Sequence, residues 1–294
     1  MKKIFILAFA LLFINSAYGQ INAKLMRYMD VSETQITFVY GGDIWIVAKS
    51  GGTAMQITHS PGEESWPKFS PDGKSIAYTA SYNGNSDVFV MPVSGGVPTR
   101  ITFNSAADRM IDWHPDGKQI LFASAREHGV GRLNQFFLVN KIGGFPEKLA
   151  IPYGELASFS PNGNQLAYIT KITENYPFKR YRGGLTSDII IYDFKTNKTE
   201  RITTDEANDG KPTWAGDKVY FLSDRDENMR LNIWEYNTNS KEKKQVTKFK
   251  DFDISFLSAG PSELIFEMGG DVSNGFGYAE LRKSSSKCYQ RFIG

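Results

Sequence analysis

The sequence predicts an all-β fold, a β-propeller of four-stranded blades. The first observation is a tight turn, Ser-Pro-Asp-Gly at residues 70–73, with apolar residues alternating on both sides. Proline presets the first corner of such a turn, aspartate binds the backbone two residues on, and glycine accepts the positive φ that closes it. Similar turns recur at residues 114–117 and 160–163, with looser copies near Trp214 and Phe256. A hairpin repeated at near-constant spacing indicates a repeat fold.

The second observation is a pair of strands that accompanies each hairpin. Each pair begins with an acidic or polar residue and a β-forming run, passes through a turn and ends in Ile-Thr or a relative. The closing residues lie 44, 48, 53 and 44 positions apart. Four short strands in every 40 to 50 residues or so are typical of a propeller, whose blades stack around a central channel. The pairs cover residues 43–58, 87–102, 135–150, 188–203 and 232–247.

Two other repeat architectures compete with this prediction. A β-sandwich also has many short strands, but it does not repeat four distinct strand types in a fixed order. An irregular β-solenoid is the remaining alternative.

The number of repeats predicts a six-bladed ring within residues 20–270. The first blade is partial, from Gln35 to Thr58, and has no obvious leading strand. Four full repeats follow. A sixth opens at residues 254–256 and 264–267 and then stops matching, so we expect the last blade to be truncated.

The tail at residues 271–294 has a different character, with glycine and serine where an apolar strand is expected. Codons can be chosen for residues 271–280 so that the frame one base later encodes an apolar strand. We therefore hypothesise a frameshift near Gly270 that truncates a longer protein. A divergent but authentic tail is the alternative.

Composition limits the functional classes. The chain has 294 residues and a net charge of +2, so the charge balance gives no reason to expect nucleic acid as a partner. Its single cysteine, Cys288, excludes an intrachain disulfide framework and a cysteine-based metal site. We expect no cofactor and no metal.

Residues 1–19 have the layout of a secretory signal peptide. Two lysines precede an unbroken apolar run from Ile4 to Phe13, and Ala17 and Gly19 are the small residues before a cleavage point at Gln20. The apolar run is short of the ~20 residues that a membrane span needs, so an uncleaved anchor is the weaker alternative. We expect export, in a bacterial style to the periplasm, and no membrane span after signal removal.

The repeats resemble the TolB-type, WD40-like propeller repeats that are also found in the prolyl oligopeptidase group and in tricorn protease. Three features favour the tricorn-like proteins. The propeller begins directly after the signal at residues 25–28, the run at 38–45 resembles the tricorn opening, and so do the segments at 179–184 and 223–226. The resemblance covers about residues 25–268.

This resemblance implies part of a large serine peptidase that trims oligopeptides and assembles as a homo-oligomer in the intact family. Such proteins carry a six-bladed propeller, a seven-bladed propeller, a PDZ domain and a catalytic region. Only the first propeller is represented here, so no catalytic serine or histidine is carried over. Two further hypotheses are a free-standing TolB-like propeller that binds proteins, and a non-functional remnant.

Catalytic motifs of the common hydrolase and metal-dependent types are absent from the sequence. His114 occupies the serine position of a repeat turn, which predicts a structural role. The acidic segment at 224–228, with Glu235 beyond it, spaces oxygens as a calcium loop does, but Met229 stands where that loop needs glycine. We therefore interpret it as a polar connection between strands.

Two basic connectors are the candidates for recognition, because propeller loops lie on the rims. The first, residues 176–184, is an unusually long link between strands, and the second spans residues 126–132. The resemblance implies that arginines in the second hold a peptide's C-terminal carboxylate, for which a guanidinium suits by bidentate pairing; Glu127 stands where another arginine is expected. The candidate binding residues are Arg126, Arg132, Lys179, Arg180, Tyr181 and Arg182.

Overall fold

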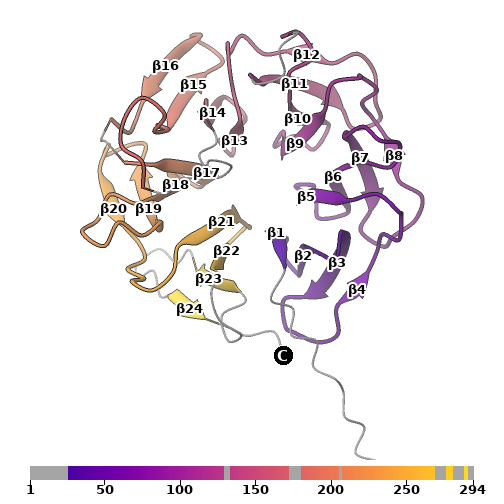
Figure 1. Cartoon of the computed structure of the whole chain (residues 1–294), viewed down its shortest axis with the longest axis horizontal. Helices are drawn as coiled ribbons and strands as arrows, with labels where there is room; N and C mark the ends of the chain where they lie inside the picture. The colour runs from indigo at the N-terminus through magenta and orange to yellow at the C-terminus, as the bar shows by residue number, and fades with distance from the viewer. Residues whose placement is uncertain are drawn as a thin grey trace, which may run out of the picture.

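The computed structural model confirms a propeller of four-stranded antiparallel blades arranged around a central axis (Figure 1). It describes residues 26–128, 133–171, 180–204 and 207–268, and the backbone alone at 276–280 and 288–290. The proposed signal segment lies outside these residues. In the part of the chain that is described, no helix is long and apolar enough to cross a membrane.

Five blades have all four strands described with their side chains. Each is ordered so that its first strand lies innermost and its fourth lies on the perimeter (Figure 1). Blade 1 is β1 (Arg27–Val31), β2 (Gln35–Tyr40), β3 (Asp43–Ala48) and β4 (Met55–Gln56); blade 2 is β5 (Glu64–Phe69), β6 (Ser75–Ala80), β7 (Asp87–Pro92) and β8 (Thr99–Arg100); blade 3 is β9 (Asp108–Trp113), β10 (Gln119–Ser124), β11 (Gln135–Asn140) and β12 (Glu147–Lys148); blade 4 is β13 (Leu156–Phe159), β14 (Gln165–Ile169), β15 (Ile190–Asp193) and β16 (Lys198–Arg201); blade 5 is β17 (Asp209–Ala215), β18 (Lys218–Ser223), β19 (Asn232–Asn237) and β20 (Lys243–Gln245).

A sixth sheet follows blade 5. Its strands are β21 (Ile254–Ala259), β22 (Glu263–Met268), β23 (Phe276–Glu280) and β24 (Cys288–Gln290). The structure thus describes five complete blades where the sequence predicted six, and only the first two strands of the sixth sheet are described with their side chains. The backbone of the predicted aberrant tail supplies the other two strands, so the sixth sheet is not the half-blade that was expected.

The prediction that the first blade lacks a leading strand was wrong. Strand β1 pairs with β2, but the register shifts between Arg27 and Asp30. This β-bulge breaks the alternation of apolar and polar residues on which recognition of a strand from sequence depends.

The predicted hairpin turn forms as the sequence indicated. Gly73 has a φ of 66°, and the Asp72 side chain accepts a hydrogen bond from the backbone N–H of Lys74 at 3.1 Å. The Ser70 hydroxyl donates to the same carboxylate at 2.6 Å, which lowers the pKa of Asp72. The repeated aspartate at this turn therefore shapes the hairpin.

The repeated Asp and Ile-Thr pattern forms a hydrogen-bonded link between the third and fourth strands, which we call the threonine lock. The Thr58 hydroxyl accepts from the Ile44 amide at 2.7 Å and lies 3.5 Å from Asp43. The lock recurs in three more blades and fails in blade 3, where Ala150 replaces threonine. The further threonines and their amide donors are Thr102 with Val88, Thr203 with Ile189, and Thr247 with Ile233.

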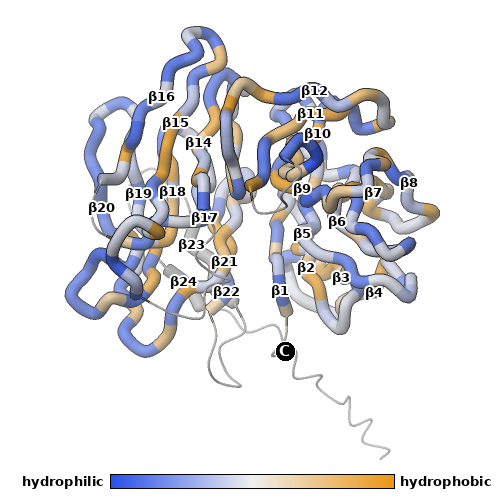
Figure 2. Tube along the Cα trace, turned by 45° about the horizontal axis from the view of Figure 1, so that its top comes forward, coloured by the Kyte–Doolittle hydropathy of each residue, from blue (hydrophilic) through white to orange (hydrophobic). Residues whose placement is uncertain are grey.

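Apolar cores lie between neighbouring sheets, which is why no blade is stable alone. The largest cluster joins blades 3, 4 and 5, and smaller clusters join the remaining neighbours. Ile265 of the sixth sheet packs with Met29 and Phe38 of blade 1. The perimeter is polar along β16 and β20 (Figure 2), where each strand carries lysine.

Candidate functional site

The innermost strands supply the side chains that enter the channel, because bulges interrupt their pairing. In β1, β5 and β17 the bulge contains a residue in the left-handed region: Tyr28 at a φ of 54°, Trp66 at 56° and Lys211 at 52°. A bulge redirects side chains away from the regular alternation. These three residues therefore turn toward the axis of the ring.

They meet in a group that we call the channel cluster: Tyr28, Trp66, Lys211 and Phe256. The Tyr28 and Trp66 rings are 4.6 Å apart, and Trp66 and Phe256 are 5.8 Å apart. The Lys211 ammonium lies 5.0 Å from the Trp66 ring and 5.2 Å from the Phe256 ring, in cation–π range. Blades 2 and 5 lie on opposite sides of the ring (Figure 1), so the Lys211–Trp66 contact crosses the channel.

A second layer, the polar belt, lies further along the same strands. Lys68 donates to Ser258 at 2.7 Å and to Asp30 at 3.4 Å. Asp30 and Asp112 accept from backbone amides of the next blade, at Phe69 and Phe159. Burial by itself lowers the pKa of Lys68, but attraction to Asp30 and Asp112 outweighs it and raises that pKa. The belt therefore holds a charged lysine between two acids and ties neighbouring blades together.

The channel cluster forms part of the wall of a cavity that we call the mouth pocket, with a volume of about 400 Å³. Blade 1, blade 5, the sixth sheet and the 180–185 connector contribute to it. A separate cavity of about 350 Å³ lies at the hairpin turns beyond the polar belt. The two cavities share no lining residue, and both layers lie between them. The apolar side chains of the mouth pocket include Leu185, Leu222, Met229, Leu231, Ile254 and Phe256.

Ion pairs surround the mouth pocket. Arg27 pairs with Glu267 at 3.2 Å, and Arg180 lies 3.3 Å from both carboxylate oxygens of Asp253. Burial raises the pKa of Glu267, against the attraction of Arg27 and of Lys211. Positive and negative groups are thus balanced at the rim.

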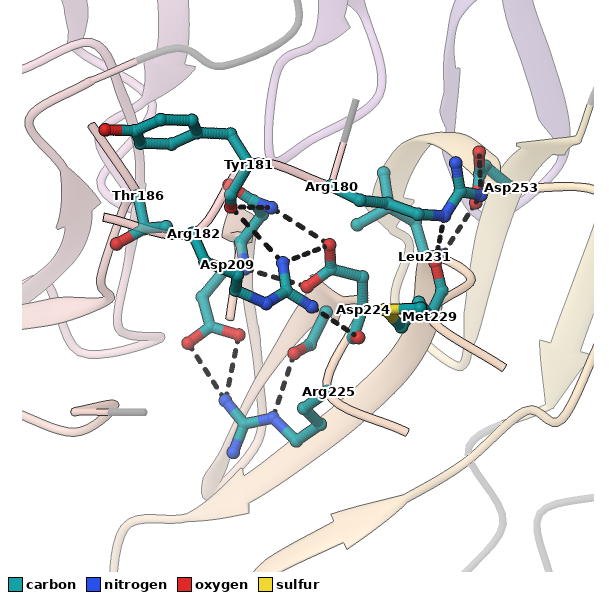
Figure 3. A network of polar contacts seen from close by, with 12 residues as sticks. Arg180, Tyr181, Arg182, Thr186, Asp209, Asp224, Arg225, Met229, Leu231 and Asp253 are labelled. Atoms are coloured by element: carbon teal, nitrogen blue, oxygen red, sulfur yellow. Dashed lines mark hydrogen bonds and ion pairs between the residues drawn. The ribbon is translucent and has the colours of Figure 1, made fainter. Parts of the chain in front are cut away.

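The structure brings three of the predicted residues to this rim, namely Arg180, Tyr181 and Arg182 (Figure 3). Arg180 donates to the Met229 carbonyl at 2.8 Å, and Arg182 pairs with Asp224 at 2.9 Å. The connector is thereby fastened to blade 5. The Tyr181 side chain is 37% exposed and is the most accessible of the three.

Asp224 holds the connector against blade 5, a role that the comparison with calcium loops did not suggest. Its carboxylate accepts from the Asn208 backbone amide at 2.8 Å and from the Asn208 side chain at 2.9 Å. Together with Arg182 it joins the connector to β17 and β18 (Figure 3). The segment is the polar connection that was predicted.

Arg126 lies apart from the mouth pocket. It pairs with the buried Asp108 at 2.6 Å, and its guanidinium stacks 4.7 Å from the Phe122 ring. Its side chain is 11% exposed. The other two candidates, Arg132 and Lys179, lie outside the described residues. Binding of a peptide carboxylate by the 126–132 connector stays a prediction.

Arg126 belongs to a motif that recurs two blades later. Arg225 pairs with the buried Asp209 at 2.8 Å and lies 5.3 Å from the Phe221 ring. In blade 2 the acid is Glu64, which accepts from Thr58 at 3.2 Å, and no ion pair involving it is found among the described residues. Burial raises the pKa of Glu64 to about 7, although a hydrogen bond with the Tyr82 side chain acts to lower it.

His114 is a turn residue, as predicted. Its Nδ1 lies 2.9 Å from an Asp116 oxygen, and its ring packs edge-on against Phe159.

Sequence reasoning missed the channel cluster. A signal exists for two of its members, because Trp66 and Lys211 each precede a proline within a strand. Proline cannot donate to the ladder, and inside a sheet it marks an edge or a bulge. Tyr28 has no such marker.

These features define a class: a β-propeller with side chains that meet across its channel and a pocket at one mouth, whose described residues do not form a recognisable catalytic group. The chain belongs to the family described as the tricorn protease N-terminal beta propeller domain, whose profile matches residues 23–274.

A curated relative and solved structures agree with this assignment. A tricorn protease homolog from Saccharolobus solfataricus is 24% identical over 248 residues, which make up 83% of this chain and 23% of that protein. The chain thus spans less than a quarter of the relative's length. The crystal structure of tricorn protease matches with a TM-score of 0.77 at 20% identity, over 92% of this chain and 26% of that one.

The fold is also similar to TolB. A putative TolB from Agrobacterium tumefaciens matches with a TM-score of 0.62 at 18% identity, over 76% of this chain and 80% of that one. At this level of identity the likeness concerns the fold alone.

Proposed function

We propose that this chain is the non-catalytic propeller of an exported tricorn-like serine peptidase, where it binds or guides oligopeptides or supports assembly. The observation that carries the proposal is the mouth pocket, which occurs in a member of the tricorn propeller family. Pockets of a few hundred Å³ with apolar walls and a few polar groups are the usual form of small-ligand sites.

Calorimetry with a mixed set of oligopeptides tests the proposal on the purified chain. We expect measurable binding without hydrolysis. Cleavage of the peptides by the chain itself, or no binding of any peptide, contradicts it.

A free-standing TolB-like propeller that binds proteins is the second candidate. The match to a TolB structure over 80% of that chain favours it. Capture of a defined envelope partner, together with the absence of a peptidase reading frame downstream, supports this candidate over the first.

We further propose that residues 1–19 are a signal peptide, that the protein is periplasmic, and that the intact ring has six blades. N-terminal sequencing of the exported protein then begins at Gln20. For the tail at 271–294 we retain the frameshift hypothesis, in which the chain is a truncated remnant with low solubility. Resequencing of the gene after codon 270 decides between this and an authentic tail.

A further inference from the structure

Backbone strain is concentrated around the mouth pocket. Seven non-glycine residues among those described have a positive φ; four of them line this pocket, and a fifth, Trp66, packs against the Tyr28 and Phe256 rings of its wall. The other two lie in the connections that lead from β15 to β16 and from β19 to β20. Each such residue costs about 1–3 kcal/mol, and strained residues gather at ligand sites. The five are Tyr28, Trp66, Arg180, Lys211 and Met229.

The chemistry of the pocket selects among ligands. Its charged rim groups already have partners, since Arg27 binds Glu267 and Arg180 binds Asp253. A charged ligand group would have to compete with these pairs. The apolar side chains, with Met229 at 47% and Leu185 at 38% exposed, offer a surface that an apolar group can cover without any such exchange.

The floor of the pocket carries the channel cluster. Its Lys211 ammonium lies 5.0 Å from the Trp66 ring across the axis, and the polar belt lies further along the same strands. A ligand that enters from this mouth therefore meets the Phe256 and Tyr28 rings.

We propose that the mouth pocket is a receptor for one bulky apolar side chain of a peptide. This proposal rests on the proposed function and names its substrate class. The side chain covers Met229 and Leu185 and reaches the aromatic rings at the floor.

Blocked tetrapeptides test the proposal by calorimetry on the full chain. The probes are acetyl-Ala-Phe-Ala-Ala-amide and the same peptide with Leu, Ala or Asp in place of Phe. Burial of the phenyl group is expected to bind the Phe peptide at least about tenfold more tightly than the Ala peptide. The Asp peptide is expected to bind no better than the Ala peptide.

Matched variants locate the site. Met229→Asp places a charge in the pocket, and aspartate tolerates the left-handed backbone there better than methionine does. We expect it to weaken binding of the Phe peptide about tenfold or more, whereas Met55→Asp on the perimeter strand β4 leaves it unchanged. Leu185→Asp, compared with the similarly exposed Leu133→Asp, repeats the test if Met229→Asp does not fold.

The outcomes separate this proposal from the one on which it rests. If peptides bind without preference for Phe, or if both pocket variants bind as the unmodified chain does, the receptor proposal is overturned and peptide binding stands. The same holds if only peptides with a free C-terminus bind. If no peptide binds in any form, the proposed function fails as well.

Discussion

Glu64 shows what a single substitution within a repeated motif does to the local chemistry. In blades 3 and 5 the corresponding buried acids, Asp108 and Asp209, each pair with an arginine. Glu64 is buried without an ion pair among the described residues; its Oε1, like Oδ1 of Asp108, has no hydrogen-bond partner there. Its pKa of about 7 follows from the cost of burying a charge.

This residue predicts a pH dependence of stability. The carboxyl titrates near 4.5 when the chain is unfolded and near 7 when it is folded, so the folded state holds the proton between these values. The free energy of unfolding therefore falls as the pH rises from about 4.5 to 7, by an amount on the order of 1–3 kcal/mol. Urea denaturation at several pH values measures it.

Glu64→Gln is expected to flatten the curve in that window and to raise stability at pH 8. The exposed neighbour Glu63 provides the control, since Glu63→Gln leaves the curve as it is. An unchanged slope in Glu64→Gln contradicts the assignment.

Asp108 differs from Glu64 because it has a cation partner, Arg126, and removing that partner is expected to lower stability. Arg126→Met leaves Asp108 buried without its cation, which costs about 3–5 kcal/mol in comparable sites. The double variant with Asp108→Asn is expected to recover a large part of this loss in urea denaturation. If the single variant is as stable as the unmodified chain, the ion pair does not serve the blade and Arg126 is available for the peptide role that the family resemblance implied.

At the scale of the element, the threonine lock holds the perimeter strand in blades 1, 2, 4 and 5. Thr102→Val removes the acceptor of the buried Val88 amide and the contact with Asp87. An unsatisfied buried donor costs about 1–3 kcal/mol. We expect this loss in thermal or urea unfolding, while Thr99→Val on the exposed face of β8 has little effect. Equal effects of the two substitutions would show that the lock adds nothing.

Much of each element was predictable because local chemistry determines it. The turns at Asp72 and the Ile-Thr strand ends depend on residues a few positions apart, so their pattern is visible in the sequence. The β-bulges are different, because they depend on the pairing of two strands. Strand β1 was missed for this reason, and with it the position of Tyr28.

The candidate site was predictable only in part for the same reason. The connector that carries Arg180 stood out as a long basic loop, and the structure places it at the pocket. Its partners Asp224 and Asp253 lie in connections next to β18 and β21, and no local pattern joins them to it. The channel cluster combines side chains of four different sheets, and only Trp66 and Lys211, each before a proline, carry a signal in the sequence.

At the scale of the whole molecule, the polar belt connects several blades of the ring. Lys68 is the cation between Asp30 and Asp112; Asp30 is buried, and the Lys68 and Asp112 side chains are partly buried. Lys68→Met leaves two acids facing each other and is expected to cost about 3–5 kcal/mol. The loss should appear as one cooperative transition shifted to lower denaturant, because several blades share the belt. A local loosening of blade 2 alone, seen by hydrogen exchange, would contradict this.

Lys68→Met combined with Asp112→Asn is the companion experiment. It removes the cation together with one acid, so we expect it to be more stable than the single variant. A double variant no better than the single one would show that Asp112 does not interact with the lysine.

The belt also makes the order of the blades chemically specific. Blade 1 contributes an acid, blade 2 the lysine, blade 3 an acid, and blade 4 the hydroxyl of Ser158, which accepts from the Trp214 amide. Exchanging blades 2 and 3 would keep every strand, turn and apolar core position of the repeat. It would also seat two carboxylates side by side and place the lysine between only one acid and the Ser158 hydroxyl. The repeats look interchangeable along the chain, yet the belt residue that a blade carries at the axis restricts that blade to one place in the ring.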